Sequence, residues 1–362
     1  MKVILESSSL LFKNYTGIPN YIYNLYEGLC TIEEIEPVLS FRLKKYFSSR
    51  TEFQNKLLEK KHLWHVGNQL VLNPKIDVVH SLHTPFLNHK KALKVATIHD
   101  LAVHLPQFEN YNFASDYFKK KRMSLFEQFN KKADVLIAVS ETTKRDYLSF
   151  FDFPEEKIHV VPLAPSLKTK NSNPQYAQLE LKKMNLRPKQ YFISIGGVSL
   201  RKNTFNLIKG FHQSYSIKNH KLVIVGKIES EFEQPIRNYI TVNNIENEII
   251  ITSYLSNSLL DILYSNASAF LFPTCYEGFG IPILEAMQAK LPVLTSNTGA
   301  APETSNGFAI LVNPLDPIDI ASGIDKLESV SETTLTNAKD FACTHTWLRT
   351  AQMTAEVYNK YL

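Results

Sequence analysis

Two glutamates, Glu277 and Glu285, lie eight positions apart and enclose a turn that contains Gly278 and Gly280. Glycine tolerates backbone angles that other residues resist, and it lets a ligand approach the main chain closely. Carboxylates repel phosphate, so we expect the two glutamates to accept hydrogen bonds from hydroxyl groups instead. The alternative is an ordinary capped helix, in which both glutamates are solvated or favour the helix dipole.

The residues on either side of this turn predict a strand followed by a helix. Residues 269–272 form an apolar run that is typical of a buried strand. Pro282 suits the first residue of a helix, because its missing N–H is not needed there. The N-terminus of a helix after a glycine-bearing turn is a ready site for phosphate. Hydroxyl-binding groups on both sides of a bound diphosphate describe a site for a nucleotide sugar.

A second candidate phosphate site follows an apolar run at residues 192–195. Adjacent glycines, Gly196 and Gly197, lead there to two cations, Arg201 and Lys202. Arginine binds phosphate oxygens through its planar fork, and lysine adds a compact point charge. A surface turn with a basic pair is the alternative. The pattern G-x-G-x-x-G is absent here, which disfavours a dinucleotide site.

Histidines follow predicted strands in the first half of the chain. His99 and Asp100 come directly after residues 95–98, where a histidine can polarise a hydroxyl or carry a proton. His80 and His83 have three-residue spacing, but no further ligand set supports zinc. We interpret these two as structural or as lining an acceptor site. A structural role is also the alternative for His99.

Length and composition bound the class of protein. A chain of 362 residues is natural for two domains, and 44% apolar with 21% charged residues is typical of a globular protein. Cys30, Cys275 and Cys343 are far apart and lack metal-ligand spacing, which indicates a reducing compartment. We find no secretory signal and no apolar stretch of the roughly 18–20 residues that a membrane span needs. We therefore expect a cytoplasmic protein.

Short apolar runs alternate with helical patterns, which predicts an α/β protein with parallel sheets covered by helices. Residues 162–166 and the polar stretch 168–178 predict an interdomain linker. We expect two Rossmann-like domains that face a cleft, with ligands at the carboxyl ends of the strands. The predicted strands are 3–5, 78–80, 95–98, 135–139 and 160–161, then 192–195, 222–225, 249–251, 269–272, 293–295 and 310–312.

Basic residues gather in the first half of the chain, within a formal net charge of +5. The clusters are residues 44–45, 90–91 and 119–122. Each is typical of a solvated face, and together they could hold the first half against an anionic membrane surface. No recognisable module for nucleic acid accompanies them, so nucleic acid is not an expected partner.

The motifs occur in an order that resembles a known family. The chain is similar to the retaining glycosyltransferases of family 4, which have the GT-B fold. Among them it most resembles bacterial mannosyltransferase-like enzymes of O-antigen and capsule assembly. The similarity runs through nearly the whole chain, with motifs at residues 97–101, 138–144, 201–203, 225–227, 276–280, 297–303 and 313–317.

The resemblance implies two Rossmann-like domains with separate tasks. Residues 1–165 should bind the acceptor, and residues 166–345 should bind the nucleotide sugar. A closing helix at about 346–362 should cross back to the first domain.

The resemblance also implies roles for individual residues. Glu277 should bind hydroxyls of the donor sugar, while Arg201 and Lys202 hold the diphosphate. His99 should lie beside the transferred sugar, and Glu285 should accept hydrogen bonds from the ribose. The remaining donor-binding residues should be Gly17, Gly197, Tyr254, Leu255, Gly278, Phe279, Gly280 and Ile281. The acceptor side should include Asp100, His83 and Asn20.

One loop departs from the family pattern. The family often has Gly-Ile-Gly-Arg-Tyr where this chain has Gly17, Ile18, Pro19, Asn20 and Tyr21. Pro19 removes a backbone donor and Asn20 removes a cation, which puts the phosphate role of the loop in doubt.

The activity that the resemblance implies is transfer of a hexose from a nucleotide-diphosphate sugar with retention, with GDP-mannose favoured. The acceptor should be a saccharide or a lipid-linked saccharide in cell-surface polysaccharide synthesis. The nucleotide sugar is then a co-substrate, and no metal is expected. The alternatives are a UDP-sugar donor, an epimerase or phosphorylase, and a silent partner protein that binds nucleotide sugar. We expect the protein in the cytoplasm, with possible contact at the inner face of the membrane.

Overall fold

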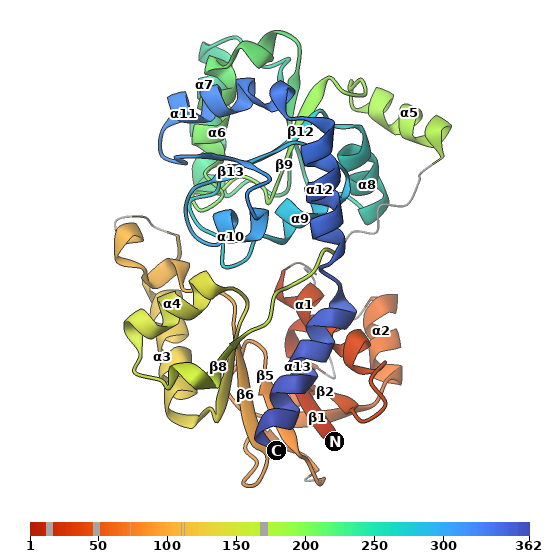
Figure 1. Cartoon of the computed structure of the whole chain (residues 1–362), viewed down its shortest axis with the longest axis vertical. Helices are drawn as coiled ribbons and strands as arrows, with labels where there is room; N and C mark the ends of the chain where they lie inside the picture. The colour runs from red at the N-terminus through yellow and green to blue at the C-terminus, as the bar shows by residue number, and fades with distance from the viewer. Residues whose placement is uncertain (12–16, 46–50, 73, 110, 112, 167–172) are drawn as a thin grey trace. The chain divides into compact units, whose positions relative to one another are not determined.

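Figure 1 shows the computed structural model of the chain, which describes residues 1–11, 17–45, 51–72, 74–109, 111, 113–166 and 173–362. The chain divides into two compact units. The first consists of residues 1–105, 114–164 and 345–362, and the second of residues 106–113 and 165–344. Each unit is built around a sheet of mostly or wholly parallel strands, so the expectation of an α/β fold with two Rossmann-like domains is confirmed.

The sheet of the first unit has eight strands in the order β4-β3-β2-β1-β5-β6-β7-β8. All neighbours pair in parallel except β3 and β4, which are antiparallel. The strands are β1 (Lys2–Glu6), β2 (Glu36–Arg42), β3 (His62–Val66), β4 (Gln69–Leu70), β5 (Val78–Ser81), β6 (Leu93–Ile98), β7 (Val135–Ala138) and β8 (Ile158–Val160).

The helices of the first unit cover both faces of this sheet. The α-helices are α1 (Ile18–Leu29), α2 (Glu52–Glu59), α3 (Asp116–Lys132), α4 (Glu141–Phe150) and α13 (Trp347–Tyr361). Short 3-10 turns are η1 (Ser8–Leu11), η2 (Leu43–Lys45), η3 (Ala102–His104) and η5 (Glu155–Lys157). Side-chain caps begin α3 and α4, where Ser115 and Ser140 accept hydrogen bonds from the first turns of these helices.

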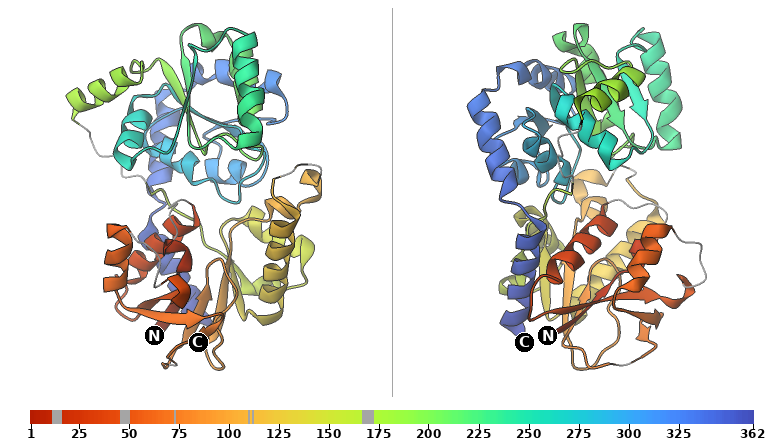
Figure 2. Two further views of the ribbon diagram at one scale, coloured as in Figure 1. Left: turned by 180° about the vertical axis from the view of Figure 1, so that it is seen from behind. Right: turned by 90° about the vertical axis from the view of Figure 1, so that its right-hand side faces the viewer.

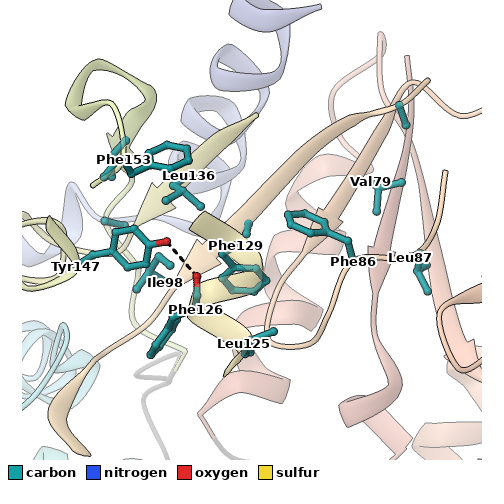
Figure 3. Close-up of a cluster of buried hydrophobic side chains, with 14 of the residues drawn as sticks. Val79, Phe86, Leu87, Ile98, Leu125, Phe126, Phe129, Leu136, Tyr147 and Phe153 are labelled. Atoms are coloured by element: carbon teal, nitrogen blue, oxygen red, sulfur yellow. Dashed lines mark hydrogen bonds between the residues drawn. The ribbon is translucent and has the colours of Figure 1, made fainter. Parts of the chain in front are cut away.

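One face of the sheet packs on α3 and α4. Figure 3 shows the apolar cluster there, with Phe126 and Phe129 of α3 against strand residues such as Ile98 and Leu136. The hydroxyl of Tyr147, on α4, donates a hydrogen bond to the carbonyl of Phe126 at 3.3 Å. Because strand side chains alternate between faces, the neighbours of these core residues point to the opposite side.

The opposite face packs on α1 and α13, which lie side by side (Figures 1 and 2). A Cβ added at Gly28 would lie 2.7 Å from the Cβ of Ala351, so this glycine allows the two helices to pack closely. The hydroxyl of Tyr358, on α13, lies 2.6 Å from Nδ1 of the buried His80. The closing helix therefore belongs to the core of the first unit.

The sheet of the second unit has six parallel strands in the order β11-β10-β9-β12-β13-β14. The strands are β9 (Tyr191–Ile195), β10 (Lys221–Val225), β11 (Ile249–Thr252), β12 (Ala269–Phe272), β13 (Val293–Ser296) and β14 (Ile310–Val312). The helices are α5 (Pro174–Lys183), α6 (Thr204–Gln213), α7 (Ser230–Val242), α8 (Asn257–Asn266), α9 (Ile281–Gln288), α10 (Ala301–Ser305), α11 (Pro317–Asp325) and α12 (Glu332–Cys343), with 3-10 turns η4 (Pro106–Phe108), η6 (Tyr215–Lys218) and η7 (Leu327–Ser329).

The predicted linker is partly wrong. Residues 167–172 lie outside the described residues, but the end of the polar stretch 168–178 forms the start of α5. Asn173 caps this helix by accepting a hydrogen bond from the N–H of Gln175 at 2.9 Å, and Pro174 fits its first turn. The local capping signal therefore prevails there over the polar composition.

In the part of the chain that the structure describes, every helix is too short or too polar to span a bilayer.

Candidate functional site

The carboxyl end of the sheet in the second unit gathers the residues that the sequence singles out. The strand order reverses direction between β9 and β12, and ligands of doubly wound folds bind at such a switch point. The loop after β9 carries Gly196, Gly197, Arg201 and Lys202, and the loop after β12 carries Glu277. The two motifs, about 75 residues apart in the sequence, are therefore neighbours in the fold.

Glu277 forms ion pairs with both cations of the other loop. Its Oε1 lies 2.8 Å from Nζ of Lys202 and 3.1 Å from Nη1 of Arg201. Glu277 is only 9% exposed. The ammonium of Lys202 also lies 4.8 Å from the centroid of the Phe272 ring, which favours its charge further. Two cations share one carboxylate, so the cluster carries a net positive charge.

The backbone fixes the two loops against each other. The N–H of Cys275 donates to the carbonyl of Arg201 at 2.9 Å, and the guanidinium of Arg201 donates to the carbonyl of Tyr276 at 3.1 Å. The N–H of Ala300 donates to the carbonyl of Glu277 at 2.9 Å. The carboxylate and the cations are thus held in place by the main chain as well as by their charges.

Glu277 is ionised in this environment. Burial would raise the pKa of its carboxyl group, but the charges of Arg201 and Lys202 and their hydrogen bonds lower it further than burial raises it. The pKa therefore lies below its ordinary value. A charged carboxylate accepts up to about four hydrogen bonds, so it has capacity for hydroxyl groups beside its two cations.

Two glycines leave room for the lysine and for close loop packing. A Cβ on Gly196 would lie 2.7 Å from Cε of Lys202, and a Cβ on Gly197 would lie 2.2 Å from the carbonyl oxygen of Lys227. Their φ angles of 117° and 77° also disfavour other residues. Both the close contacts and the positive φ angles therefore require glycine at positions 196 and 197.

Helix α9 begins at the end of the second loop. Its N-cap is Gly280, with φ of 96°. Pro282 is the second helical residue, one position later than the sequence predicts, and still lies in the first turn. Gly278 and Phe279 are buried just before the helix, whereas Ile281 is half-buried. The N-terminus of α9 therefore adds the positive end of a helix dipole beside the cluster of cations.

Glu285 lies inside α9 and is bound to other parts of the second unit. Its Oε1 accepts a hydrogen bond from the N–H of Ser166, and its Oε2 accepts one from the hydroxyl of Tyr264, both at 3.3 Å. Burial and the charge of Glu285 raise the pKa of Tyr264, so this hydroxyl stays protonated and donates. Both bonds are long, which leaves the carboxylate able to exchange them for ligand hydroxyls.

Tyr254 and Leu255 lie apart from the cluster of cations. They follow β11, which is an edge strand, while the cluster follows β9 and β12 in the middle of the sheet. Tyr254 is 59% exposed, so its ring is open to a planar partner.

The first unit holds His99, directly after β6. Its Nε2 lies 2.9 Å from the carbonyl oxygen of Leu82, so Nε2 carries the hydrogen and Nδ1 has a free lone pair for accepting. Burial lowers the pKa of His99 to about 4, and the imidazole is therefore neutral at pH 7. The ring also contacts the edge of Tyr21, with centroids 4.8 Å apart.

His80 belongs to a buried network beneath His99. Its Nδ1 faces the hydroxyl of Tyr358, and its Nε2 lies 2.8 Å from Oγ1 of Thr97. Thr97 also bonds the hydroxyl of Tyr21 at 3.1 Å. Burial lowers the pKa of His80 to about 3. Of the two interpretations, the structural one holds for this residue.

The residues predicted for the acceptor, Asn20, Asp100 and His83, come from separate elements of the first unit, as does Gly17, which was predicted for the donor. Asn20 lies in the first turn of α1, where its carbonyl accepts a hydrogen bond from the side chain of Asn24 at 2.7 Å. Gly17 caps that helix with φ of 52°, and an added Cβ would meet nothing within 4 Å. Asp100 follows His99, and His83 follows β5. Strand order places β5 and β6 side by side, so these last two residues share one edge of the sheet.

Arg122 is a residue that sequence reasoning missed. The basic cluster 119–122 is expected on a solvated or membrane-facing surface, and Lys120 and Lys121 are indeed exposed. For Arg122 this expectation is wrong, because its side chain is buried. The signal was present in the spacing, since Arg122 lies three, four and seven positions before the apolar residues of the same helix stripe, Leu125, Phe126 and Phe129.

Buried Glu6 was also missed. It ends β1, and its carboxylate accepts hydrogen bonds from Thr84 at 2.7 Å and from the N–H of Ser8 at 3.3 Å, and it lies 3.2 Å from Nε2 of His65. Burial raises its pKa, but these bonds and the charge of His65 lower it further. These contacts join β1, β3 and the loop after β5 at the carboxyl edge of the sheet.

Metal ligands do not gather anywhere in the described ranges: no three side chains of His, Cys, Asp or Glu lie together there as a metal ion would need.

Two family models match the two units of the chain. Residues 178–339 match the model of glycosyl transferases group 1, and residues 33–164 match the model of Glycosyltransferase Family 4. Among curated proteins, the chain is 25% identical over 352 residues to O-antigen chain mannosyltransferase B of Escherichia coli, and the match covers 90% of each chain.

Solved structures of similar fold cover nearly the whole chain. A glycosyltransferase from Rickettsia africae has a TM-score of 0.77 at 16% identity, covering 99% of this chain and 98% of that one. Anabaena Alr3699/HepE, solved in complex with UDP and glucose, has a TM-score of 0.75 at 14% identity, covering 100% of this chain and 99% of that one. At such identities the likeness concerns the fold.

Proposed function

Because the chain belongs to the GT-B glycosyltransferases of family 4, we propose that it transfers a hexose with retention from a nucleotide-diphosphate sugar, with GDP-mannose as the favoured donor. The acceptor is a saccharide or a lipid-linked saccharide of a cell-surface polysaccharide. The relative named O-antigen chain mannosyltransferase B supports mannose and this polysaccharide class. The nucleotide sugar acts as a co-substrate, as the UDP bound to HepE suggests.

The observation that carries this proposal is the cluster of Arg201, Lys202 and Glu277 at the switch point of the second sheet. The net positive charge and the N-terminus of α9 suit a diphosphate. The ionised carboxylate of Glu277 suits hydroxyls of the donor sugar, and Glu285 suits those of the ribose. Gly197, Gly278, Phe279, Gly280 and Ile281 supply close backbone approach, and the exposed ring of Tyr254, with Leu255, suits the base.

In the proposed reaction the bond between the anomeric carbon and the diphosphate oxygen breaks while the acceptor oxygen bonds to the same face of that carbon. The proton of the acceptor hydroxyl passes to the leaving diphosphate oxygen. Arg201 and Lys202 stabilise the negative charge that develops on the diphosphate, and such preorganised donors are each worth about 3–4 kcal/mol. These cations and the helix dipole neutralise the leaving group, so the proposal requires no metal.

His99 takes part in this proposal as a neutral hydrogen-bond acceptor. Its Nε2–H donates to the carbonyl of Leu82, so Nδ1 is the ring nitrogen left to accept a hydrogen bond. A pKa of about 4 keeps the ring uncharged at neutral pH, which favours accepting from a sugar hydroxyl over donating a proton. Asp100, His83 and Asn20 are the proposed acceptor-side residues, with the Gly17 loop at the phosphate side.

The nucleotide preference can be tested by thermal unfolding. We expect GDP to raise the melting temperature more than UDP, dTDP or ADP, because a ligand that binds only the native state stabilises it by mass action. At a concentration of 100 times its Kd, the gain is about 2.7 kcal/mol. Differential scanning fluorimetry with the four nucleotides at equal concentration measures this order.

The same assay separates the alternatives. A larger rise in melting temperature with UDP would indicate a UDP-sugar as the donor. No rise with any of the nucleotides would contradict the proposed donor site itself. Release of GDP from GDP-mannose only when acceptor is present excludes an epimerase, whereas binding without turnover over a broad acceptor panel would favour a silent partner protein. The anomeric configuration of the product, read by NMR, tests retention.

We also propose that the first unit touches the inner face of an anionic membrane through the start of α3. Tyr117 and Phe118 are 77% and 43% exposed there, next to the exposed Lys120 and Lys121. Aromatic rings suit the interfacial region of a bilayer, and each nearby lysine contributes about 1 kcal/mol of attraction to anionic lipid.

Vesicle sedimentation tests this contact. The protein should bind vesicles of phosphatidylcholine with phosphatidylglycerol and not vesicles of phosphatidylcholine alone. The double variant Lys120→Glu/Lys121→Glu should lower this binding at least tenfold. The matched control is Lys182→Glu/Lys183→Glu, a pair of adjacent exposed lysines on α5. If both double variants lose vesicle binding equally, the effect depends on overall charge, and this would contradict a specific contact through α3.

A further inference from the structure

Arg122 carries a buried charge that the donor chemistry does not use. It lies on the apolar stripe of α3 with Leu125, Phe126 and Phe129, and only 9% of it is exposed. Arginine stays protonated in proteins, so burial does not remove its charge. A buried charge is costly unless an opposite charge or several hydrogen bonds compensate it.

The protein itself compensates Arg122 only in part. Its Nη1 donates to Nδ1 of His83 at 3.1 Å, its Nη2 donates to the carbonyl of Asp100 at 3.4 Å, and its guanidinium lies 4.9 Å from the centroid of Phe126. Among the described residues, Asp100 supplies an opposite charge, and its carboxylate acts on Arg122 through charge alone, without a hydrogen bond. Within the described ranges, two of the five N–H donors of Arg122 are used, and both acceptors are neutral.

His83 presents a second donor next to this charge. Because its Nδ1 accepts from Arg122, the ring hydrogen sits on Nε2, and burial, followed by the charge of Arg122, lowers the pKa of His83 to about 3. The contact with Arg122 engages Nδ1 and leaves Nε2–H to act as a donor. A histidine with a neutral ring and a fixed tautomer is a donor whose direction does not change with pH near neutrality.

His104, which like Arg122 contacts the ring of Phe126, has a nitrogen without a partner in the described part of the chain. Nε2 of His104 is buried and makes no hydrogen bond there. The His104 ring contacts the edge of Phe126, with centroids 5.9 Å apart, and Arg122 lies over the same Phe126 ring. A buried polar atom without a partner points to a group that the protein expects from outside, such as a ligand or an ordered water.

We propose that Arg122 and the Nε2–H of His83 form a subsite for an anionic group, a phosphate or a carboxylate, that belongs to the acceptor. A planar guanidinium fork binds such an anion through two parallel hydrogen bonds. The anion would then supply the negative charge that compensates the buried guanidinium. The subsite adjoins His99 and Asp100 at the carboxyl ends of β5 and β6. The inference rests on the proposed glycosyl transfer and narrows its acceptor to anionic molecules.

The test compares acceptors that differ only in the anionic group. The probes are methyl α-mannoside, mannose 1-phosphate and a mannoside with a carboxylate-bearing aglycone, each supplied with the donor that the nucleotide assay selects. The wild-type enzyme should have a kcat/KM at least tenfold higher for one or both anionic probes, and which of them is preferred identifies the source of the charge. In Arg122→Gln this preference should fall at least tenfold, mainly through KM, since a charge-assisted hydrogen bond is lost.

The matched control is Arg145→Gln, which removes an exposed arginine of α4 in the same unit. It should keep the preference of the wild type. If Arg122→Gln does not fold by its melting curve, Arg122→Lys keeps the charge but loses the fork, and His83→Ala removes the second donor; each should lower the preference. An equal loss for neutral and anionic probes would mean a purely structural arginine and overturn the inference.

Two failures are distinguishable. If the wild-type enzyme releases nucleoside diphosphate with none of the probes while other acceptors also fail, the proposed glycosyl transfer is wrong. If it transfers to neutral and anionic probes equally well, the transfer stands and only the anionic subsite is wrong.

Discussion

Replacing Lys202 by alanine should lower the turnover number at least a hundredfold while the protein still folds. The ammonium of Lys202 lies 2.8 Å from Glu277 and over the Phe272 ring, in a position fixed by the turn at Gly196. In the proposed reaction it stabilises the charge on the departing diphosphate, and removal of one such preorganised donor costs roughly a hundredfold to a thousandfold in rate. Release of nucleoside diphosphate under saturating donor and acceptor measures the effect.

The matched control for this variant is Lys218→Ala. Lys218 is an exposed lysine of the same unit. It precedes β10 and therefore lies at the amino ends of the strands, whereas the candidate site lies at their carboxyl ends. It should leave turnover within about twofold of the wild type, as surface substitutions usually do. Near-normal turnover in Lys202→Ala would contradict the proposal that Lys202 stabilises the diphosphate. If turnover is lost, a melting temperature close to that of the wild type excludes unfolding as the cause.

Glu277→Gln should be the second most damaging change for transfer. Glutamine keeps the shape of the side chain but removes the negative charge that two cations share, so Arg201 and Lys202 repel each other and lose their fixed positions. We expect at least a hundredfold lower turnover and about 1–3 kcal/mol less stability, since charge-assisted hydrogen bonds of a buried group are lost. Steady-state kinetics and urea unfolding measure the two effects separately.

The pH dependence of stability gives an independent check on Glu277. Its pKa is lower in the folded protein than its ordinary value, so its contribution is complete above the ordinary pKa and disappears as the pH falls through the folded pKa. The stability gap between wild type and Glu277→Gln should therefore be widest near neutral pH and should close in acid. Glu233→Gln is the control, because its ion pair with Arg237 is exposed and such pairs contribute little. A gap that stays constant down to acid pH would contradict an ionised, ion-paired Glu277.

Much of the fold could be predicted from short apolar runs. Residues 269–272 and 249–251 match β12 and β11 because parallel strands are buried on both faces and therefore consist of nearly continuous apolar residues. β2 and β3 were not predicted: β2 contains Pro37 and Ser40, and β3 contains two histidines, so neither has such a run. Their pairing with β1 and with each other makes them strands, and that pairing is a tertiary effect.

The local geometry around Glu277 was easier to predict from the sequence than the burial of Arg122. Glycines at positive φ and a proline in the first turn of α9 are local requirements that leave a mark on the sequence. For Arg122 the sequence held one sign of burial, its helical spacing from the apolar residues of α3, and the lysines just before it predict an exposed surface instead. Its burial depends on the fold of α3 against the sheet, which composition does not report.

The sequence by itself determined the class of the protein and the residue types of the candidate donor site, because apolar runs, glycines and caps act over a few neighbouring residues. Only the tertiary structure decided which distant groups meet. It paired Glu277 with Arg201 and Lys202 across the β9–β12 switch point, tied the ring hydrogen of His99 to Leu82, and buried Arg122 beside His83. These outcomes depend on strand order and on the packing of helices over each sheet. Electrostatic energy and hydrogen bonding act through distances in space, and the sequence does not contain those distances until the chain has folded.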